Sequence, residues 1–248
     1  MNDKINILGV NVDMVTIDEA VEKICSFLEE DKLHSVYTPN SEIIMMAYKD
    51  AEFAKILNKS ELLTADGIGV VYASRILKKP LKERAAGYDI AKKLLAELNK
   101  SGSRLFLFGG KPGIAEKAQE NIKNEYNNIN IVGTRNGYFK PEEEQGIIDE
   151  INNSGADVLF VCIGAPAQEK FIDRNRDKLK VKVAMGIGGS LDVFAGVTER
   201  APKFWCDTGL EWLYRLIKEP KRFVRMLALP KFGLTVVFKG KRYKKEEK

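Results

Sequence analysis

Histidine is nearly absent from this chain, since His34 is the only one among 248 residues. A serine–histidine or cysteine–histidine catalytic site would have to use His34, which lies inside a predicted strand, and no G-x-S-x-G turn is present to carry a nucleophile. The three cysteines lie far apart and form no Cys-x-x-Cys pair. Their spacing argues against a zinc site and a disulfide framework, and it fits a reducing cytoplasm.

Long apolar runs are missing as well. The N-terminal stretch MNDKINILGV lacks the apolar core of a signal peptide, and the best apolar stretch elsewhere is the seven residues 232–238. We therefore expect no export and no membrane-spanning helix. Asp-x-Asp, the pair with which many nucleotide-sugar transferases hold a divalent ion, is also absent. We expect neither a metal nor a cofactor, so arginine, lysine and backbone dipoles would meet the charge of a departing pyrophosphate.

Charge is distributed unevenly along the chain. Residues 199–248 hold 14 Lys and Arg against 6 Asp and Glu, whereas residues 1–198 hold 26 and 29. The net charge of +5 thus combines a mildly acidic body with a basic tail. Such a tail suits nucleic acid, anionic lipid or a phosphorylated substrate.

Strand and helix patterns alternate through the body. Strands are predicted at 5–12, 34–38, 61–64, 104–108, 129–132, 157–163 and 181–185, with helices at 16–28, 41–58, 67–78, 90–100, 114–126 and 142–153. Several strands are continuously apolar, which is typical of a parallel sheet covered on both faces. We predict an α/β fold, a Rossmann-like parallel sheet, over residues 1–198. A basic, helical, amphipathic appendage follows over residues 199–248.

Three predicted strands end in glycine clusters, which let backbone N–H groups approach a phosphate. Tight β–α turns also need glycine, so each cluster alone suits structure as well as nucleotide binding. The sequence GGKPG fits neither G-x-G-x-x-G nor the P-loop, which argues against a standard dehydrogenase and a Walker-type ATPase. The candidate nucleotide-binding residues are Gly109, Gly110, Gly113, Gly164, Gly188 and Gly189.

A lone carboxylate, Asp66, follows a predicted strand in the stretch ELLTADGIG. Asp-Gly is common in turns, and Asp before an apolar run makes a good helix N-cap. The alternative is a catalytic base at the sheet edge where α/β proteins gather ligands. If Asp66 is not the base, Asp89 and Asp192 are the next candidates.

The tail reads GLEWLYRLIKEPKRFVRML and contains two amphipathic patterns with embedded arginines. These helices can simply pack on the body with solvated basic faces. They can also lie in a membrane interface, with apolar residues in lipid and arginines against phosphates.

Seven motifs in one order resemble the WecG/TagA/CpsF glycosyltransferase family over residues 5–228. They are TPNSE (38–42), ADGIG with a later ER and G (65–87), LFGGKPG (107–113), GYF (137–139), IGAPAQE (163–169), GIGGSLDVFAGVTERAP (186–202) and GLEWLYRL with EPKR (209–222). The resemblance implies inverting transfer of N-acetylmannosamine from UDP-ManNAc to the C4 hydroxyl of GlcNAc on undecaprenyl diphosphate. That step builds the wall teichoic acid linkage unit.

The same resemblance implies roles for individual residues. Asp66 matches the catalytic base, and Thr38, Asn40, Arg84 and Gln168 match pocket residues. In the appendage, Arg215, Arg222 and Arg225 match residues that touch phosphates and close over the site. The chain has Ala65 before Asp66 where proline is usual, for which we expect only a small change in loop stiffness.

The resemblance further implies a cytoplasmic protein, peripheral on the inner face of the cell membrane, that binds an anionic surface and no nucleic acid. A homo-oligomer is left open. Two alternative hypotheses for the function are a family member that uses another UDP-sugar for capsule or exopolysaccharide, and a non-catalytic nucleotide-binding protein that docks on membranes. A nucleotide-sugar oxidoreductase and a nucleic-acid-binding arm are further alternatives; the latter requires salt-sensitive DNA binding.

Sugar transfer should survive EDTA, because the sequence has neither Asp-x-Asp nor a histidine cluster to hold a divalent ion. The measurement is turnover before and after chelation, with Mg²⁺ or Mn²⁺ added back. A strict requirement for either ion would show that a metal site exists.

Overall fold

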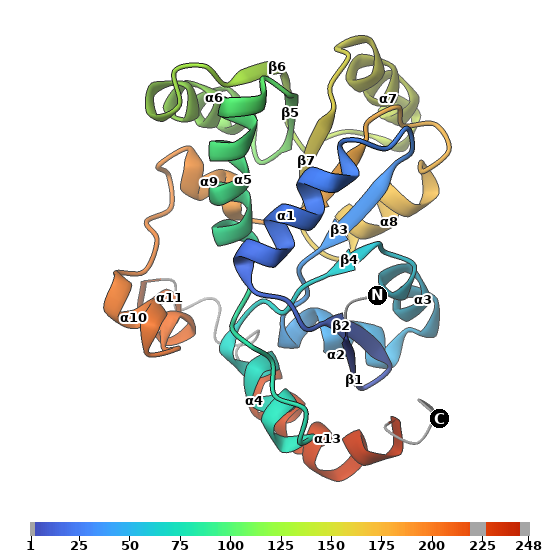
Figure 1. Cartoon of the computed structure of the whole chain (residues 1–248), viewed down its shortest axis with the longest axis vertical. Coiled ribbons are helices and arrows are strands. Elements are labelled where there is room, and N and C mark those ends of the chain that lie inside the picture. Colours follow the sequence, from blue (N-terminus) through green and yellow to red (C-terminus); the bar gives the residue numbers. More distant parts are fainter. Residues whose placement is uncertain (1–2, 219–226, 244–248) are drawn as a thin grey trace.

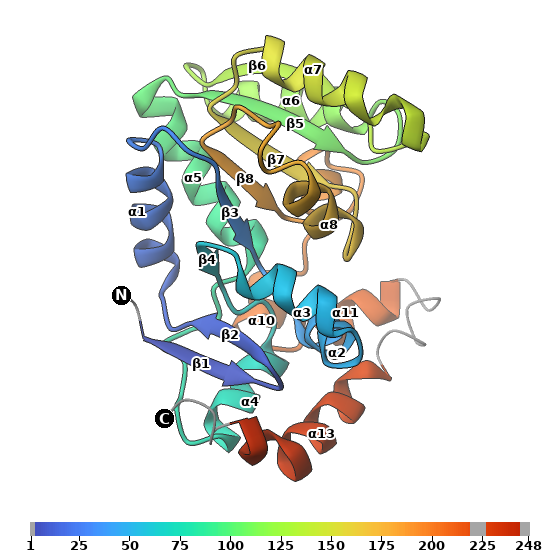
Figure 2. The same cartoon turned by 90° about the vertical axis from the view of Figure 1, so that its right-hand side faces the viewer.

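A six-stranded sheet forms the centre of the computed structural model, which describes residues 3–218 and 227–243. Its strand order is β4-β3-β8-β7-β5-β6, and every neighbouring pair is parallel (Figures 1 and 2). The predicted α/β fold with a parallel sheet is confirmed. The strands are β3 (His34–Tyr37), β4 (Leu62–Leu63), β5 (Arg104–Gly109), β6 (Asn130–Arg135), β7 (Val158–Cys162) and β8 (Val183–Gly186).

Helices cover both faces of the sheet. Successive strand residues alternate between two cores: Leu105 and Leu107 face one, whereas Phe106 and Phe108 face the other. The first core includes α1 (Ile17–Phe27), α5 (Gly87–Ser101), α6 (Ile114–Glu125) and α9 (Ser190–Phe194). The second includes α2 (Ser41–Lys49), α3 (Ala51–Asn58), α7 (Glu144–Asn153), which follows the 3₁₀ turn η1 (Pro141–Glu143), and α8 (Ala167–Arg174).

Local sequence signals set several helix ends. Thr16 caps α1: its hydroxyl accepts the N–H of Glu19, whose carboxylate accepts the N–H of Thr16. The helical pattern over residues 41–58 forms two helices because Asp50 adopts an extended backbone and caps α3 through the N–H groups of Glu52 and Phe53.

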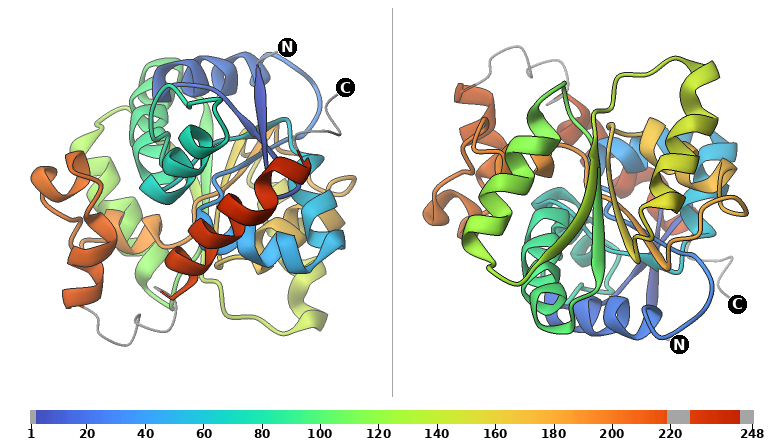
Figure 3. Two further views of the ribbon diagram at one scale, coloured as in Figure 1. Left: turned by 90° about the horizontal axis from the view of Figure 1, so that it is seen from below. Right: turned by 90° about the horizontal axis from the view of Figure 1, so that it is seen from above.

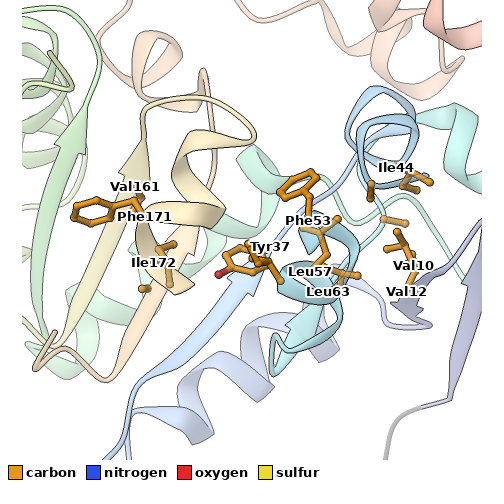
Figure 4. Packing of buried hydrophobic residues seen from close by; sticks show 14 of the residues in the cluster. Val10, Val12, Tyr37, Ile44, Phe53, Leu57, Leu63, Val161, Phe171 and Ile172 are labelled. Carbon is orange, nitrogen blue, oxygen red and sulfur yellow. The ribbon is translucent and has the colours of Figure 1, made fainter. Parts of the chain in front are cut away.

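The hairpin of β1 (Lys4–Ile7) and β2 (Val10–Asp13) extends the second core beyond the sheet, together with the helices α4 (Ile68–Ile76) and α13 (Ala228–Tyr243). The two other helices of the C-terminal part are α10 (Lys203–Asp207) and α11 (Glu211–Lys218). Figure 4 follows this core from Val161 and Phe171 through Tyr37 to Val10 on the hairpin.

Helix α13 lies within the predicted helical appendage of residues 199–248, although the sequence patterns gave it no separate bounds. It contacts α2, α4 and β1, and it lies beside α4 (Figure 3). Its side chains Phe232 and Val236 are fully buried in the second core. Among the helices of the described segments, none is long and apolar enough to cross a bilayer.

Phe232→Ala should lower the free energy of unfolding by about 3–5 kcal/mol, because it leaves a cavity under α13. The matched control is Phe238→Ala on the same helix, where the ring is 79% exposed and the change should stay within about 0.5 kcal/mol. Urea unfolding of both variants measures the difference. Equal effects of the two substitutions would contradict this packing.

Candidate active site

A cavity of about 580 Å³ lies at the carboxyl ends of β3, β4, β7 and β8. Because these strands are parallel, the loops that follow them meet at one edge of the sheet. Eight of the predicted site residues line this cavity: Thr38, Asn40, Asp66, Arg84, Gly164, Gln168, Gly188 and Gly189. A second hollow of about 570 Å³, between α7 and α8, contains none of them.

Thr38 and Asn40 follow β3 and join the site to the fold. The Thr38 hydroxyl is buried and lies 3.4 Å from the carbonyl oxygen of Gly186 on β8. The side-chain oxygen of Asn40 caps α2 by accepting the N–H groups of Glu42 and Ile43, at 2.9 and 3.0 Å. This bond fixes the amide, so the Asn40 side chain enters the cavity wall in a set orientation.

Asp66 lies in the loop between β4 and α4 and does not cap the helix. The N-cap is Gly67, which has φ +86° and makes no side-chain cap. The Asp66 backbone N–H donates to the carbonyl of Pro39, and its carboxylate lies 3.5 Å from the backbone nitrogen of Gly87 at the start of α5. Glycine at position 87 lets the start of α5 approach Thr38, because a Cβ there would lie 2.6 Å from the Thr38 hydroxyl oxygen.

Gln168 forms the buried floor of the cavity. Its Oε1 accepts the N–H of Gly188 at 3.0 Å, and its Nε2 donates to Oε1 of Glu169 at 2.9 Å. Both side chains are almost fully buried. Burial raises the pKa of Glu169, and the hydrogen bond from Gln168 offsets part of that effect. The bond from Gly188 ties the loop after β8 to the start of α8.

Arg84 belongs to a network of charges on the cavity wall. Its guanidinium donates to Glu211 of α11 at 2.6 Å and lies 3.5 Å from Asp89. Burial disfavours the charged guanidinium, but Glu211 and two neighbouring carboxylates outweigh that cost and raise the pKa of Arg84. Arg84 therefore stays charged and connects the C-terminal helices to the body.

The glycine clusters do not all meet. Gly164, Gly188 and Gly189 line the cavity, whereas Gly109, Gly110 and Gly113, at the end of β5, do not. At Gly109 the reason for glycine is packing: φ is +138°, and a Cβ would lie 2.3 Å from the carbonyl oxygen of Cys162.

The predicted tail arginines are only partly described. Arg215 lies on α11, the helix that also brings Glu211 and Trp212 to the cavity. Arg222 and Arg225 lie outside the described residues.

The cavity also includes residues to which the sequence analysis assigned no binding role. Tyr88 and Arg200 lie within the motifs quoted above or next to them, and Asp89 and Asp192, considered there only as alternative bases, are in the wall as well. The sequence could have indicated Tyr88 and Asp89 through the GYD sequence after the ER motif, and Arg200 through the TERAP segment. Within the described residues, no group of three or more His, Cys, Asp or Glu side chains could hold a metal ion.

Glu169→Gln should become progressively more stable relative to the wild type as the pH rises above 4.5 toward the raised pKa of Glu169. The unfolded chain ionises its glutamate near pH 4.5, whereas the folded protein keeps the buried acid neutral to higher pH. The stability that the neutral Glu169 contributes is complete below that value and declines as the pH rises toward the raised pKa. Glutamine does not titrate. Thermal unfolding across this range measures the effect, and a constant difference in Tm would contradict it.

Comparison with known proteins identifies relatives over nearly the whole chain. The family model described as "Glycosyl transferase WecG/TagA/CpsF family" matches residues 5–246. A Bacillus subtilis protein named N-acetylglucosaminyldiphosphoundecaprenol N-acetyl-beta-D-mannosaminyltransferase is 38% identical over 239 residues, which cover 96% of this chain and 92% of the relative. A Bacillus spizizenii protein of the same name is 37% identical over 217 residues, 88% of this chain and 83% of the relative. The resemblance inferred from the motifs is confirmed, and the chain belongs to the WecG/TagA/CpsF family of glycosyltransferases.

Proposed function

We propose that this protein transfers N-acetylmannosamine from UDP-ManNAc to GlcNAc-diphospho-undecaprenol in wall teichoic acid linkage-unit synthesis. The observation that carries the proposal is the 38% identity, over 96% of the chain, to an enzyme named for this transfer. The geometry supports it, because the loops after four parallel strands bring a carboxylate, an amide and an arginine to one cavity. The names of the relatives favour this donor over other UDP-sugars.

Asp66 is the proposed general base. It accepts the proton of the acceptor hydroxyl as that oxygen bonds to the anomeric carbon of N-acetylmannosamine. The bond from this carbon to the UDP oxygen breaks, and its electron pair leaves on UDP. Attack from the face opposite UDP inverts the anomeric configuration. The hydroxyl becomes acidic only as the new bond forms, so a carboxylate of ordinary pKa can serve.

The departing UDP gains negative charge that cationic groups must stabilise. Arg84 supports this role by its place in the cavity wall and its raised pKa. Arg215, Arg222 and Arg225 complete the proposed set from the C-terminal segment. Thr38, Asn40 and Gln168 orient the sugars, and the loops at Gly164, Gly188 and Gly189 receive the nucleotide.

The lipid acceptor places the proposed reaction at the inner face of the cell membrane, with the protein bound peripherally from the cytoplasm. Helix α13 supports this arrangement. Its outer face presents Leu234, Val237 and Phe238, which are 60%, 51% and 79% exposed. Lys231 and Arg242 are exposed on the same helix. Apolar side chains beside cations suit the interface of an anionic bilayer.

The test of this function is UDP release by the purified protein with UDP-ManNAc and a short-chain GlcNAc-diphospho-lipid. We expect release only when both substrates are present, and little release when UDP-GlcNAc or UDP-glucose replaces the donor. Nucleotide binding without release, or faster release from another UDP-sugar, would overturn the proposal.

Asp66→Asn should lower turnover by roughly 10²–10⁴-fold and leave the fold and UDP binding intact, because the amide cannot take up the proton. The control is Asp50→Asn, at an N-cap outside the cavity, which should retain wild-type turnover. Steady-state rates measure turnover, circular dichroism checks the fold, and titration with UDP measures nucleotide binding. Near-normal turnover of Asp66→Asn would remove Asp66 from the base role.

A further inference from the structure

Arg200 faces the cavity from the loop between α9 and α10. Its guanidinium lies 4.5 Å above the centre of the Tyr88 ring and forms an ion pair of 2.5 Å with Oδ1 of Asp89. Tyr88 also stacks on Phe194, at 4.9 Å between ring centroids. The side chain of Arg200 is therefore held at a fixed place in the wall.

Asp89 joins Arg200 to Arg84. Its Oδ1 accepts from Arg200, and its Oδ2 lies 3.5 Å from Arg84. The two guanidinium groups thus share one carboxylate, each on its own oxygen. An anion with oxygens of similar spacing and greater charge, such as a phosphate, can occupy the position between them.

The charges of the cavity make these two arginines necessary for an anionic ligand. Among its described lining residues, the cations are Arg84 and Arg200. The acidic lining residues outnumber them: Glu42, Asp66, Asp89, Asp192 and Glu211. A diphosphate entering this acidic surface needs every guanidinium that the wall offers, because burial strengthens repulsion as well as attraction.

We propose that Arg84 and Arg200 together bind the diphosphate of a substrate, which takes the place of the Asp89 carboxylate that both guanidinium groups contact in its absence. The inference rests on the proposed function and adds Arg200 to Arg84 as a residue that binds the diphosphate. Both substrates of that reaction carry a diphosphate, so the ligand is the nucleotide or the lipid acceptor. Arginine suits the role because its planar fork donates two parallel hydrogen bonds.

The test compares variants that break the same ion pair from opposite sides. Arg200→Gln removes the guanidinium group proposed to bind the diphosphate, whereas Asp89→Asn breaks the ion pair and keeps Arg200. Arg200→Lys keeps the charge without the fork, and it also serves if Arg200→Gln folds poorly. The matched control is Arg174→Gln, because Arg174 likewise pairs with a carboxylate, Glu144, and lies 5.6 Å from the centre of an aromatic ring, away from the cavity.

One arm titrates full-length protein with UDP and with uridine by calorimetry. The other measures KM for a short-chain GlcNAc-diphospho-lipid. Arg200→Gln should weaken UDP binding or raise that KM by at least about tenfold, while uridine affinity stays within about twofold. A loss of UDP affinity would identify the nucleotide as the source of the diphosphate, and a raised KM would identify the lipid acceptor. The diphosphate affinity of Arg200→Lys should lie between those of the wild type and Arg200→Gln. The variants Asp89→Asn and Arg174→Gln should retain diphosphate affinity within about threefold of the wild type.

Wild-type diphosphate affinity of Arg200→Gln in both arms would overturn the inference. Equal losses in Arg200→Gln and Asp89→Asn would overturn it as well, because they would mean that the ion pair only tethers the loop. Either result leaves the proposed function standing if the wild type releases UDP when both substrates are present. A wild-type protein that binds neither UDP nor the acceptor would overturn both.

Discussion

The parallel direction of the six strands is the constraint on which the rest of the site depends. It places the loops after β3, β4, β7 and β8 at one edge, so residues far apart in the sequence share a cavity. Apolar cores on both faces hold the sheet rigid. Loops at such an edge can vary in chemistry while the strands that carry them stay fixed.

Polar contacts then fix the positions of the loops and helix ends at this edge of the sheet. Gln168, at the start of α8, accepts a hydrogen bond from the loop after β8, and Gly87 lets the start of α5 approach Thr38. The C-terminal segment is part of the same construction. Glu211 of α11 pairs with Arg84 in the cavity wall, while α13 buries Phe232 in the second core. Helix α13, which we propose meets the membrane, also lines the proposed substrate cavity at Ala228 and Leu229.

The sequence was informative where the cause of structure is local. Continuous apolar strands predicted the parallel sheet, and Thr16 with Glu19 predicted the start of α1. Ordered motifs identified the family and most of the cavity. Local pattern could not separate the cluster at Gly109 from that at Gly188, because their difference lies in strand order: β7 stands between β5 and β8. The pairs Arg84–Glu211 and Arg200–Asp89 join positions more than a hundred residues apart, so no local sequence pattern predicts them.

A crystal structure of the protein with UDP-ManNAc bound would show whether this edge of the sheet is the donor site. We expect the nucleotide to lie against the loops at Gly164 and Gly188, with its diphosphate at Arg84 and the anomeric carbon open to attack from the side of Asp66. Binding of the nucleotide at the Gly109 cluster, or in the hollow between α7 and α8, would contradict it.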